Sequence, residues 1–263
     1  MIKLNGQIIE QNHFPDGTLL MKWYADTHAV STITWQYESD AELFALYSLK
    51  RHLDCTVPGW NDFLYLPYIP HARQDRVKNK DDVFTLKYFA EIINSLGFKK
   101  VIVIDPHSSV SEALINNIEV CTPGCFIEQA LNDIGDDNLL MFYPDEGAMK
   151  RYSGMVDKPY AFGIKRRDWA TGKIEGLDAA GSIEKIKDSR ILIVDDICSK
   201  GGTFYHSAKK LKELGAKEIY LYVSHCENTI LKGDLLSSDL VEKVYTTNSI
   251  FTKEHEKIEV FEL

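Results

Sequence analysis

The stretch ILIVDDICSKGGTF, from Ile191 to Phe204, decides how the fold and the function of this chain can be interpreted. Four apolar residues lead into the adjacent acids Asp195 and Asp196, and a turn with paired glycines follows at residues 199–203. We expect the apolar run to be a buried strand and the segment from Tyr205 onward to be a helix. A glycine-rich turn before a helix offers several N–H groups and the positive end of the helix dipole, which together bind a phosphate. The stretch therefore predicts a phosphate-binding loop next to two carboxylates.

The two acids need a separate role, because carboxylates repel a phosphate. Asp195 and Asp196 are suited to accept hydrogen bonds from two neighbouring hydroxyl groups, or to hold a divalent cation. A phosphate beside a vicinal diol describes a ribose 5-phosphate group. The alternative is a plain strand–turn–helix connection in which an aspartate caps the helix.

The same order of strand and helix recurs along most of the chain. Apolar runs indicate strands, and apolar residues at helical spacing indicate helices, with Gly97 and Gly215 as helix stops. Strands that alternate with helices favour parallel sheets, and continuous apolar strands favour sheets covered on both faces. The expected strands are residues 62–69, 99–107, 138–147, 190–197, 218–225 and 241–249, and the expected helical segments are residues 85–98, 111–118, 130–137 and 204–216.

Polar side chains follow several of these strands, at the edge where open parallel sheets bind their ligands. The strand ends fall into two groups, before and after about residue 140, which suits two similar α/β halves. The polar residues at strand ends are Asp105, His107, Asp145, Asp195, Asp196 and His225.

Composition and charge narrow the class of protein. The chain has 263 residues, of which 44% are hydrophobic and 26% charged, as in ordinary globular proteins. The formal net charge of −9 argues against nucleic-acid and anionic-membrane partners, which usually require a basic face. We expect no membrane span, because no apolar run approaches about 20 residues. The N-terminus has no signal-peptide pattern, so we expect a cytoplasmic location with reduced cysteines.

Beyond its chemistry, the strand–Asp–Asp–turn stretch resembles the phosphoribosyl-diphosphate motif of type I phosphoribosyltransferases and their relatives. YLPYIPHARQDR (65–76) resembles the ATP-site segment of the ribose-phosphate pyrophosphokinases, and the run ARQDR is highly specific. Four further segments resemble that family in the same order along the chain, as does TTNSI (246–250). They are HFPDGTLLMK (13–22), VIDPHSS (103–109), YPDEGAMKR (143–151) and FGIKRRDW (162–169).

The resemblance implies an α/β fold of two similar phosphoribosyltransferase-type domains, each a mostly parallel sheet flanked by helices. Residues 1–138 would carry the ATP-site segments, and residues 139–263 the ribose-phosphate loop. The implied reaction moves the β,γ-diphosphate of ATP to the C1 hydroxyl of ribose 5-phosphate, giving phosphoribosyl diphosphate and AMP, with Mg²⁺ as cofactor. A homo-oligomer, dimer or hexamer, is also implied, because in relatives the N-terminal segment completes the adenine pocket of a neighbouring subunit.

The resemblance also assigns roles to individual residues. ATP binding falls to Phe14, Asp16, Arg73, Gln74, Asp75 and His107, metal contact to His107 and Asp145, and catalysis to Lys165, Arg167 and His107. Binding of the ribose phosphate falls to Asp195, Asp196, Ser199, Lys200, Gly201, Gly202 and Thr203.

Departures from the family pattern leave the acceptor open. Ser199 and Lys200 stand where relatives usually have Asp and Thr, and Thr18 stands where they commonly have Glu. The added positive charge suits ribose 5-phosphate, or a larger 5-phosphorylated ribose such as ADP-ribose. A phosphoribosyltransferase and a non-catalytic regulatory homologue are further alternatives. The ARQDR segment argues against the first, and the retained lysine, arginine and paired acids argue against the second.

Overall fold

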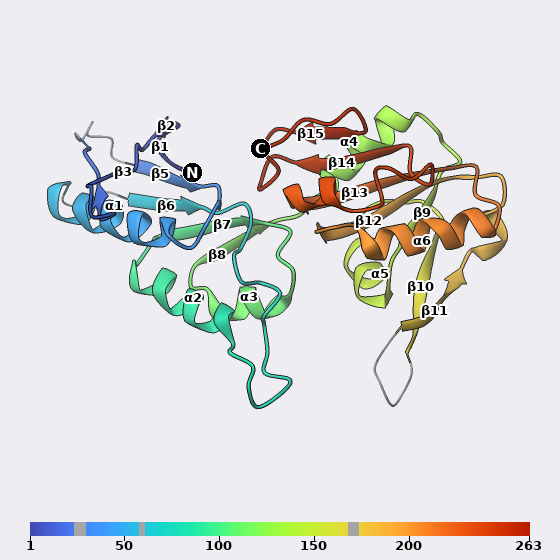
Figure 1. Ribbon diagram of the computed structural model, residues 1–263, viewed down its shortest axis with the longest axis horizontal. Coiled ribbons are helices and arrows are strands. Elements are labelled where there is room, and N and C mark those ends of the chain that lie inside the picture. The colour runs from blue at the N-terminus through green and yellow to red at the C-terminus, as the bar shows by residue number, and fades with distance from the viewer. Residues whose placement is uncertain (24–29, 58–60, 168–173) are drawn as a thin grey trace. The chain divides into compact units, whose positions relative to one another are not determined.

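The computed structural model describes residues 1–23, 30–57, 61–167 and 174–263, with backbone alone at residues 30, 61, 165–167 and 174–178 (Figure 1). The chain divides into two compact units, Met1–Thr122 and Pro123–Leu263. Each unit contains a mainly parallel sheet with helices packed on it, so the predicted α/β class and the mostly parallel sheets are confirmed.

The first unit contains a six-stranded sheet in the order β2-β1-β5-β6-β7-β8. Strands β5 to β8 are parallel, whereas β1 runs antiparallel to β2 and β5. A separate hairpin pairs β3 with β4. The strands are β1 (Ile2–Leu4), β2 (Gln7–Ile8), β3 (Asn12–His13), β4 (Leu19–Leu20), β5 (Val30–Trp35), β6 (Asn61–Tyr65), β7 (Lys100–Ile104) and β8 (Ile118–Cys121).

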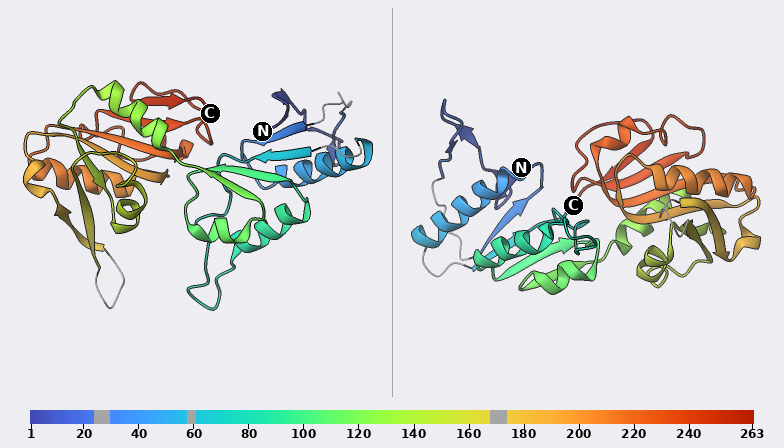
Figure 2. Two further views of the ribbon diagram at one scale, coloured as in Figure 1. Left: turned by 180° about the vertical axis from the view of Figure 1, so that it is seen from behind. Right: turned by 60° about the horizontal axis from the view of Figure 1, so that its bottom comes forward.

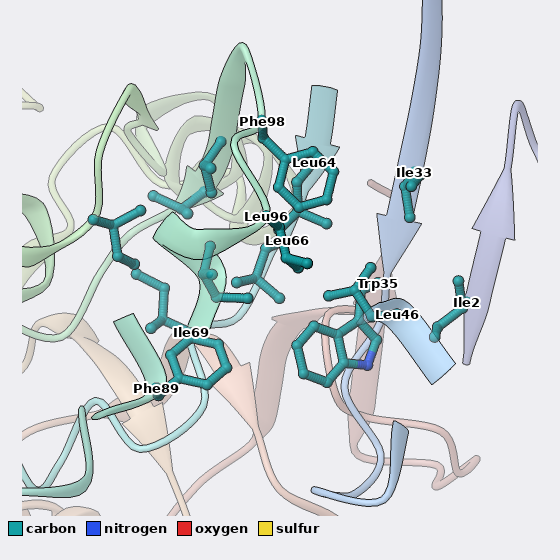
Figure 3. Close-up of a cluster of buried hydrophobic side chains, with 14 of the residues drawn as sticks. Ile2, Ile33, Trp35, Leu46, Leu64, Leu66, Ile69, Phe89, Leu96 and Phe98 are labelled. Atoms are coloured by element: carbon teal, nitrogen blue, oxygen red, sulfur yellow. The ribbon is translucent and has the colours of Figure 1, made fainter. Parts of the chain in front are cut away.

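The apolar core of the first unit lies on one face of this sheet. Ile33, Leu64 and Val101 are register partners on neighbouring strands and belong to one buried cluster. Helices α1 (Glu42–Thr56) and α2 (Thr85–Ser95) bury Leu46 and Phe89 in the same cluster, and α3 (Ser109–Leu114) follows β7 (Figures 1 and 3). The intervening residues Phe63, Tyr65 and Ile102 of β6 and β7 are only half-buried, so the second face of this sheet is less fully covered than expected.

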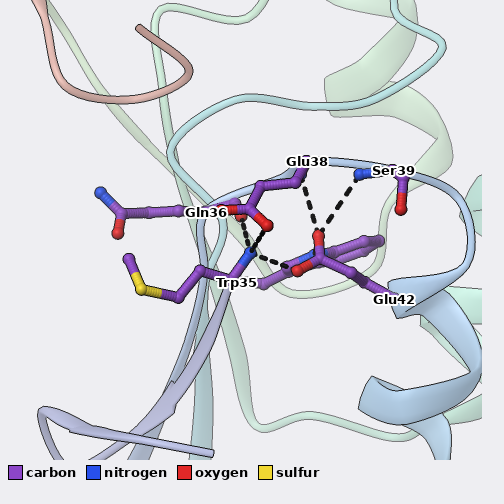
Figure 4. Close-up of polar contacts among 6 residues, drawn as sticks. Trp35, Gln36, Glu38, Ser39 and Glu42 are labelled. Carbon is purple, nitrogen blue, oxygen red and sulfur yellow. Dashed lines mark hydrogen bonds and ion pairs between the residues drawn. The ribbon is translucent and has the colours of Figure 1, made fainter. Parts of the chain in front are cut away.

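A buried carboxylate fixes the start of α1. Glu42 accepts hydrogen bonds from the indole N–H of Trp35 and the backbone N–H of Glu38, both at 2.9 Å, and it also contacts the Met1 ammonium (Figure 4). Burial alone would raise the pKa of Glu42, but the hydrogen bonds from Met1 and Trp35 outweigh it, so the pKa lies below its ordinary value. The carboxylate thus joins the first strand, the end of β5 and the first turn of α1.

The second unit contains a seven-stranded sheet in the order β11-β10-β9-β12-β13-β14-β15, parallel except for β11. Its strands are β9 (Leu140–Tyr143), β10 (Tyr160–Arg167), β11 (Ile174–Gly181), β12 (Arg190–Cys198), β13 (Glu218–Cys226), β14 (Lys243–Thr247) and β15 (Ile258–Phe261). Its helices are α4 (Gly124–Ile134), α5 (Glu146–Tyr152) and α6 (Gly202–Glu213), with short 3-10 turns η1 (Ile183–Lys185) and η2 (Asn228–Lys232).

Both faces of the second sheet are covered, as continuous apolar strands predict. Along β12, Ile191 and Ile193 pack in a cluster with α6, whereas Leu192 and Val194 pack in a second cluster with α4 and α5. Figure 2 shows α4 and α6 on opposite sides of this sheet. The alternation sets the directions of the two acids that follow: Asp195 continues the row facing α6, and Asp196 the row facing α5.

Helix α4 belongs to the second unit, so the units divide after Thr122 and not after residue 138 as predicted. Ile127 and Ala130 of α4 are buried in the cluster that contains Tyr245 and Phe261. Asp133 of the same helix accepts hydrogen bonds from the Tyr245 hydroxyl at 2.7 Å and from Lys243 Nζ at 3.0 Å. These contacts tie α4 to β14, which is about a hundred residues away in sequence.

Candidate active site

The glycine turn after β12 forms a tight loop into α6. Gly201 adopts a left-handed backbone with φ of 80° and is the N-cap, so α6 begins at Gly202, three residues before the predicted start at Tyr205. The Gly201 carbonyl accepts the first helical hydrogen bond, from Tyr205 N at 2.8 Å. Gly202 and Thr203 are exposed, and they lie in the first turn, whose N–H groups have no partner within the helix. The predicted anion-binding geometry of a loop at a helix N-terminus is therefore present.

A second segment, residues 227–235, packs against this loop. A Cβ atom on Gly233 would lie 1.9 Å from the Lys200 carbonyl oxygen, so only glycine allows the two backbones to approach this closely. A Cβ on Gly201 would lie 3.0 Å from Leu235 Cδ2. The Lys200 backbone is held against the protein while its side chain is exposed.

Side-chain hydrogen bonds at Ser199 also hold the loop against residues 227–235. Its hydroxyl donates to Glu227 Oε2 at 2.8 Å, and the Thr229 hydroxyl donates to the same oxygen at 2.9 Å. The two hydroxyl oxygens are 3.2 Å apart. Sequence reasoning missed Glu227 and Gly233, because no motif links them to a loop about thirty residues earlier.

The paired acids have different surroundings. Asp196 is buried and forms an ion pair with Arg151 of α5 at 3.1 Å. Asp195 accepts a hydrogen bond from Asp196 N at 3.0 Å. Burial, followed by the neighbouring Asp196 charge, raises the pKa of Asp195 well above its ordinary value, and the carboxyl group of Asp145 acts in the same direction. Asp145, Asp195 and Asp196 therefore gather at the carboxyl edge of the second sheet.

Asp145 also caps α5. Its Oδ1 accepts a hydrogen bond from Ala148 N at 3.0 Å, which is the capping role that a strand-end aspartate commonly has. A Cβ on Gly147 would lie 3.2 Å from this oxygen, so the glycine leaves room for the carboxylate. The cap fixes the position of Asp145 near Asp195.

His225 comes from the next strand, β13, and is almost fully buried. Its Nδ1 lies 2.8 Å from the Ser249 hydroxyl, which comes from the segment after β14. This polar contact inside the unit supports a structural role for His225.

Two of the predicted ATP-site segments, which contain Asp75 and His107, meet in the first unit. Asp75 is buried, and its two oxygens accept hydrogen bonds from Arg76 at 2.7 and 2.9 Å. These bonds hold the pKa of Asp75 below its ordinary value, and the nearby His107 ring acts in the same direction. Asp105 turns the chain after β7 with φ of 40°, which brings His107 to this position. The pairing between Asp75 and Arg76 indicates that Asp75 orients the loop.

The neighbouring residues of the ARQDR segment are exposed. Arg73 and Gln74 both lie at the surface, and Gln74 Oε1 accepts a hydrogen bond from the Thr85 hydroxyl at the start of α2, at 2.8 Å. In the N-terminal hairpin, Phe14 is exposed, and Asp16 Oδ1 accepts hydrogen bonds from the Thr18 backbone N–H at 3.0 Å and from the Thr18 hydroxyl at 2.7 Å. Thr18, which replaces the usual glutamate, therefore closes the hairpin turn on Asp16.

Lys165 and Arg167 lie on β10, which pairs with β11 as an antiparallel hairpin with a register shift between Arg166 and Arg167. Their side chains are outside the described residues. In the described part of the chain, no group of three or more His, Cys, Asp or Glu side chains is arranged to hold a metal ion. Among the described helices, none is long and apolar enough to cross a membrane.

Comparisons with known proteins agree with this geometry. A family model described as "Phosphoribosyl transferase domain" matches residues 154–251. Proteins named ribose-phosphate pyrophosphokinase are similar in sequence: one from Saccharolobus solfataricus is 25% identical over 82% of this chain and 76% of its own length. One from Clostridium perfringens is 28% identical over 74% of this chain and 62% of its own length. Ribose-phosphate pyrophosphokinase 1 from Listeria monocytogenes is 29% identical over 84% of this chain and 68% of its own length.

The fold has a solved counterpart. The crystal structure of phosphoribosylpyrophosphate synthetase from Mycobacterium smegmatis matches with a TM-score of 0.78 and 16% identity, covering 97% of this chain and 86% of that one. The match to several curated relatives spans 62% of their length, so this chain corresponds to part of them. With its glycine loop and paired acids, the chain is similar to the ribose-phosphate pyrophosphokinases in sequence and has a phosphoribosyltransferase-like fold.

Proposed function

We propose that this protein transfers the β,γ-diphosphate of ATP to the C1 hydroxyl of ribose 5-phosphate, giving phosphoribosyl diphosphate and AMP. The observation that carries the proposal is the loop of residues 199–203 at the start of α6, with Asp195 directed to the same face of the sheet. The names of the relatives support the same reaction.

The second unit would bind the acceptor. The N–H groups at the start of α6 suit the 5-phosphate, because they are aligned with the helix dipole. Asp195 would accept hydrogen bonds from the ribose hydroxyls on the α6 face. Its raised pKa reflects an unfavourable buried charge, which hydroxyl donors would relieve on binding.

The first unit would bind ATP. Arg73 is exposed and has a planar guanidinium that forms paired hydrogen bonds to phosphate oxygens. Gln74 has both an amide donor and an amide acceptor for a nucleotide, and Asp75 would keep the loop in place through Arg76. His107 lies on the neighbouring turn, close enough to influence Asp75.

Magnesium is the cofactor that this chemistry requires, and when bound it neutralises and orients the phosphate groups. In the second unit, a carboxylate at Asp145 suits an ion that keeps most of its ligands as water and phosphate oxygens. In the first unit, His107 is a separate candidate ligand. Because Mg²⁺ shares its coordination with the nucleotide, few protein ligands are needed. Lys165 and Arg167 would stabilise the charge on the transferring group.

The test is AMP formation from ATP, Mg²⁺ and ribose 5-phosphate, with both products identified by mass. We expect AMP only when acceptor and metal are both present, and we expect Lys165→Ala to lower kcat by about 100-fold or more. Lys185→Ala, an exposed lysine of η1, is the matched control and should leave kcat unchanged. Absence of AMP together with binding of phosphoribosyl diphosphate would instead support a phosphoribosyltransferase. A lack of turnover with intact ATP binding would support a regulatory homologue.

ADP-ribose belongs in the same assay as a second acceptor. The relatives named above are named for ribose phosphate, so ribose 5-phosphate is the first choice. The reason to include ADP-ribose is Lys200, whose side chain is exposed at the loop that would hold the 5-phosphate. A second phosphate on the acceptor would extend outward from that position. Lys200→Thr should then weaken ADP-ribose more than ribose 5-phosphate, and equal losses would exclude this role for Lys200.

The proposed assembly is a homo-oligomer, dimer or hexamer, in which the N-terminal hairpin contacts a neighbouring subunit. Phe14 is 51% exposed, which is unusual for a phenylalanine and suits a ring that stacks on a ligand or a partner. Sedimentation of the active species measures the state directly. A fully active monomer would contradict the proposal.

A further inference from the structure

In the phosphate loop, residues 199–203, the hydroxyl of Ser199 already donates its proton to another side chain. Ser199 and Thr229 both approach Glu227 Oε2, at 2.8 and 2.9 Å. An ionised carboxylate only accepts hydrogen bonds, so both hydroxyl groups must donate to it. Since a hydroxyl has one proton and two lone pairs, Ser199 can then only accept a further hydrogen bond.

The direction of this hydrogen bond changes what Ser199 can recognise. A phosphate group with ionised oxygens needs donors, and Ser199 has no second proton to give. A sugar hydroxyl, in contrast, can donate to the remaining lone pairs of Ser199. The phosphate is then left to the N–H groups at the start of α6 and to Thr203.

We propose that Glu227 is a positioning residue that fixes Ser199 as a hydrogen-bond acceptor for a hydroxyl group of the acceptor substrate. This inference rests on the proposed function of the loop. Glu227, on the segment after β13, would thus set the direction of a hydrogen bond in the loop that follows β12.

The backbone around Glu227 is fixed well enough for such a role. Its N–H donates to the Cys198 carbonyl at 2.8 Å, directly before Ser199. On the other side, Asn228 Nδ2 donates to the Thr252 hydroxyl at 2.9 Å, and Thr252 N donates back to Asn228 Oδ1 at 3.1 Å. The close approach of Gly233 to the Lys200 carbonyl holds the other end of the segment against the loop. The backbone that carries the Glu227 carboxylate is therefore held beside Ser199 from both sides.

The decisive variant is Glu227→Gln, which keeps the shape of the side chain. Its amide offers one acceptor and one donor group in place of two acceptor oxygens, so Ser199 is no longer held as an acceptor: where the N–H₂ faces the hydroxyl, the Ser199 proton is free for the ligand. We expect the affinity for ribose 5-phosphate to fall by about tenfold. The affinity for inorganic phosphate, which has no sugar hydroxyls, should stay the same or rise. The KM for ATP and kcat should be unchanged, because the chemistry and the nucleotide site are not touched.

Calorimetry with the full chain measures both affinities without turnover, and steady-state kinetics separates KM from kcat. Glu213→Gln makes the same charge change at the far end of α6, where Glu213 lies 3.6 Å from Lys210 Nζ, and serves as the control. Ser199→Ala should lower the affinity for ribose 5-phosphate by a similar factor. In that background Glu227→Gln should add nothing, because Glu227 acts on the acceptor substrate only through the Ser199 hydroxyl.

Three outcomes would overturn the inference: an equal loss of ribose 5-phosphate and phosphate affinity, an additive double variant, or a lower kcat with an unchanged KM for the acceptor. Hydrogen exchange at residues 199–204 gives a test that does not depend on the proposed reaction. Glu227→Ala should increase exchange there relative to Glu213→Gln, and equal exchange in the two variants also overturns the inference. If the wild-type protein neither turns over nor binds ribose 5-phosphate, the proposed function fails, and the exchange result alone decides the role of Glu227 in the loop.

Discussion

The carbonyl oxygen of Lys200 occupies the space that a side chain on Gly233 would need, at 1.9 Å from the position of a Cβ atom. The backbone of Gly233 has φ of −100° and ψ of 172°, which any residue can adopt, so only this contact requires glycine. The segment after β13 and the phosphate loop are thus fitted to each other through their backbones.

Gly233→Ala should therefore push the loop away from its position. We expect a loss of about 1–3 kcal/mol in the free energy of unfolding, the usual cost of overpacking, together with weaker binding of the acceptor. Thermal unfolding and calorimetry with ribose 5-phosphate are the measurements. Gly154→Ala, where an added Cβ would have no neighbour within 4 Å, is the control, and an equally mild effect of both variants would show that the loop adapts without cost.

Glu42→Gln should destabilise the first unit at neutral pH by about 1–3 kcal/mol, since a buried charged acceptor of several hydrogen bonds is lost. Because its folded-state pKa lies below the unfolded value, the charge of Glu42 stabilises the protein above about pH 4.3. That stabilisation is lost as the pH falls through the folded-state pKa, so the difference between wild type and variant should shrink below about pH 4.

Denaturant unfolding at several pH values checks the behaviour of Glu42. Glu146→Gln removes an exposed carboxylate that pairs with Lys150 at 2.7 Å and should change the stability by less than about 1 kcal/mol. A difference between wild type and Glu42→Gln that does not depend on pH would contradict the role given to the charge.

Asp195→Asn should stabilise the protein while it removes acceptor binding. The folded-state pKa of Asp195 is raised, so its ionised form costs stability, and this cost appears as the pH rises above the unfolded value of about 3.9. We expect the variant to gain about 1 kcal/mol at neutral pH, or about 2–4 °C in Tm, and to gain nothing at pH 3. Scanning calorimetry at the two pH values measures this, and a less stable variant at neutral pH would refute the account.

Tyr245→Phe tests the attachment of α4 to the second sheet. Removal of the hydroxyl that donates to Asp133 at 2.7 Å should cost about 1 kcal/mol and increase amide exchange in α4. Tyr220→Phe removes a hydroxyl that donates to Glu218, two residues away on the same strand, at 2.9 Å. That control should leave exchange in α4 unchanged, and if both variants loosen α4 equally, the contact with Asp133 is not its anchor.

Strands buried on both faces were the easiest elements to predict. Residues 190–197 and 218–225 are continuous apolar runs, and they correspond to β12 and β13. Helix α2 was also predictable, because its apolar spacing is regular and Gly97 ends it with a left-handed backbone, φ of 69°.

Elements whose stability depends on distant contacts were missed or misplaced. Helix α1 was not predicted, because its buried face includes Glu42 and Lys50, charges that are buried through contacts with Trp35 and Asp62. Residues 115–118 were expected to extend a helix, but the chain leaves α3 at Leu114 and begins β8 at Ile118. The antiparallel β10–β11 hairpin was not anticipated either, since only the first half of β10 is apolar and β11 contains Glu175, Asp178 and several small residues.

The candidate site was predictable only where its residues are contiguous in sequence. The loop of residues 199–203 and the two acids before it were found in this way, although α6 begins earlier than expected. Glu227 and Arg151 reach the loop and Asp196 through the fold, by pairing of neighbouring strands and packing of α5. A single sequence has no signal for such contacts.

The alternation of buried residues along β12 determines the face of the sheet on which each acid at its end lies. Ile193 and Val194 pack on opposite faces, so the number of residues between the sheet core and the glycine turn decides which acid lies beside α6 and which lies beside Arg151. A deletion or insertion of one residue within 191–194 would exchange the two carboxylates between faces, together with the apolar side chains between the change and Asp195. We therefore expect the length of this strand to be constant during evolution, whereas the loops that follow it can vary. Changes in which acceptor substrate is used are expected to arise in these loops alone.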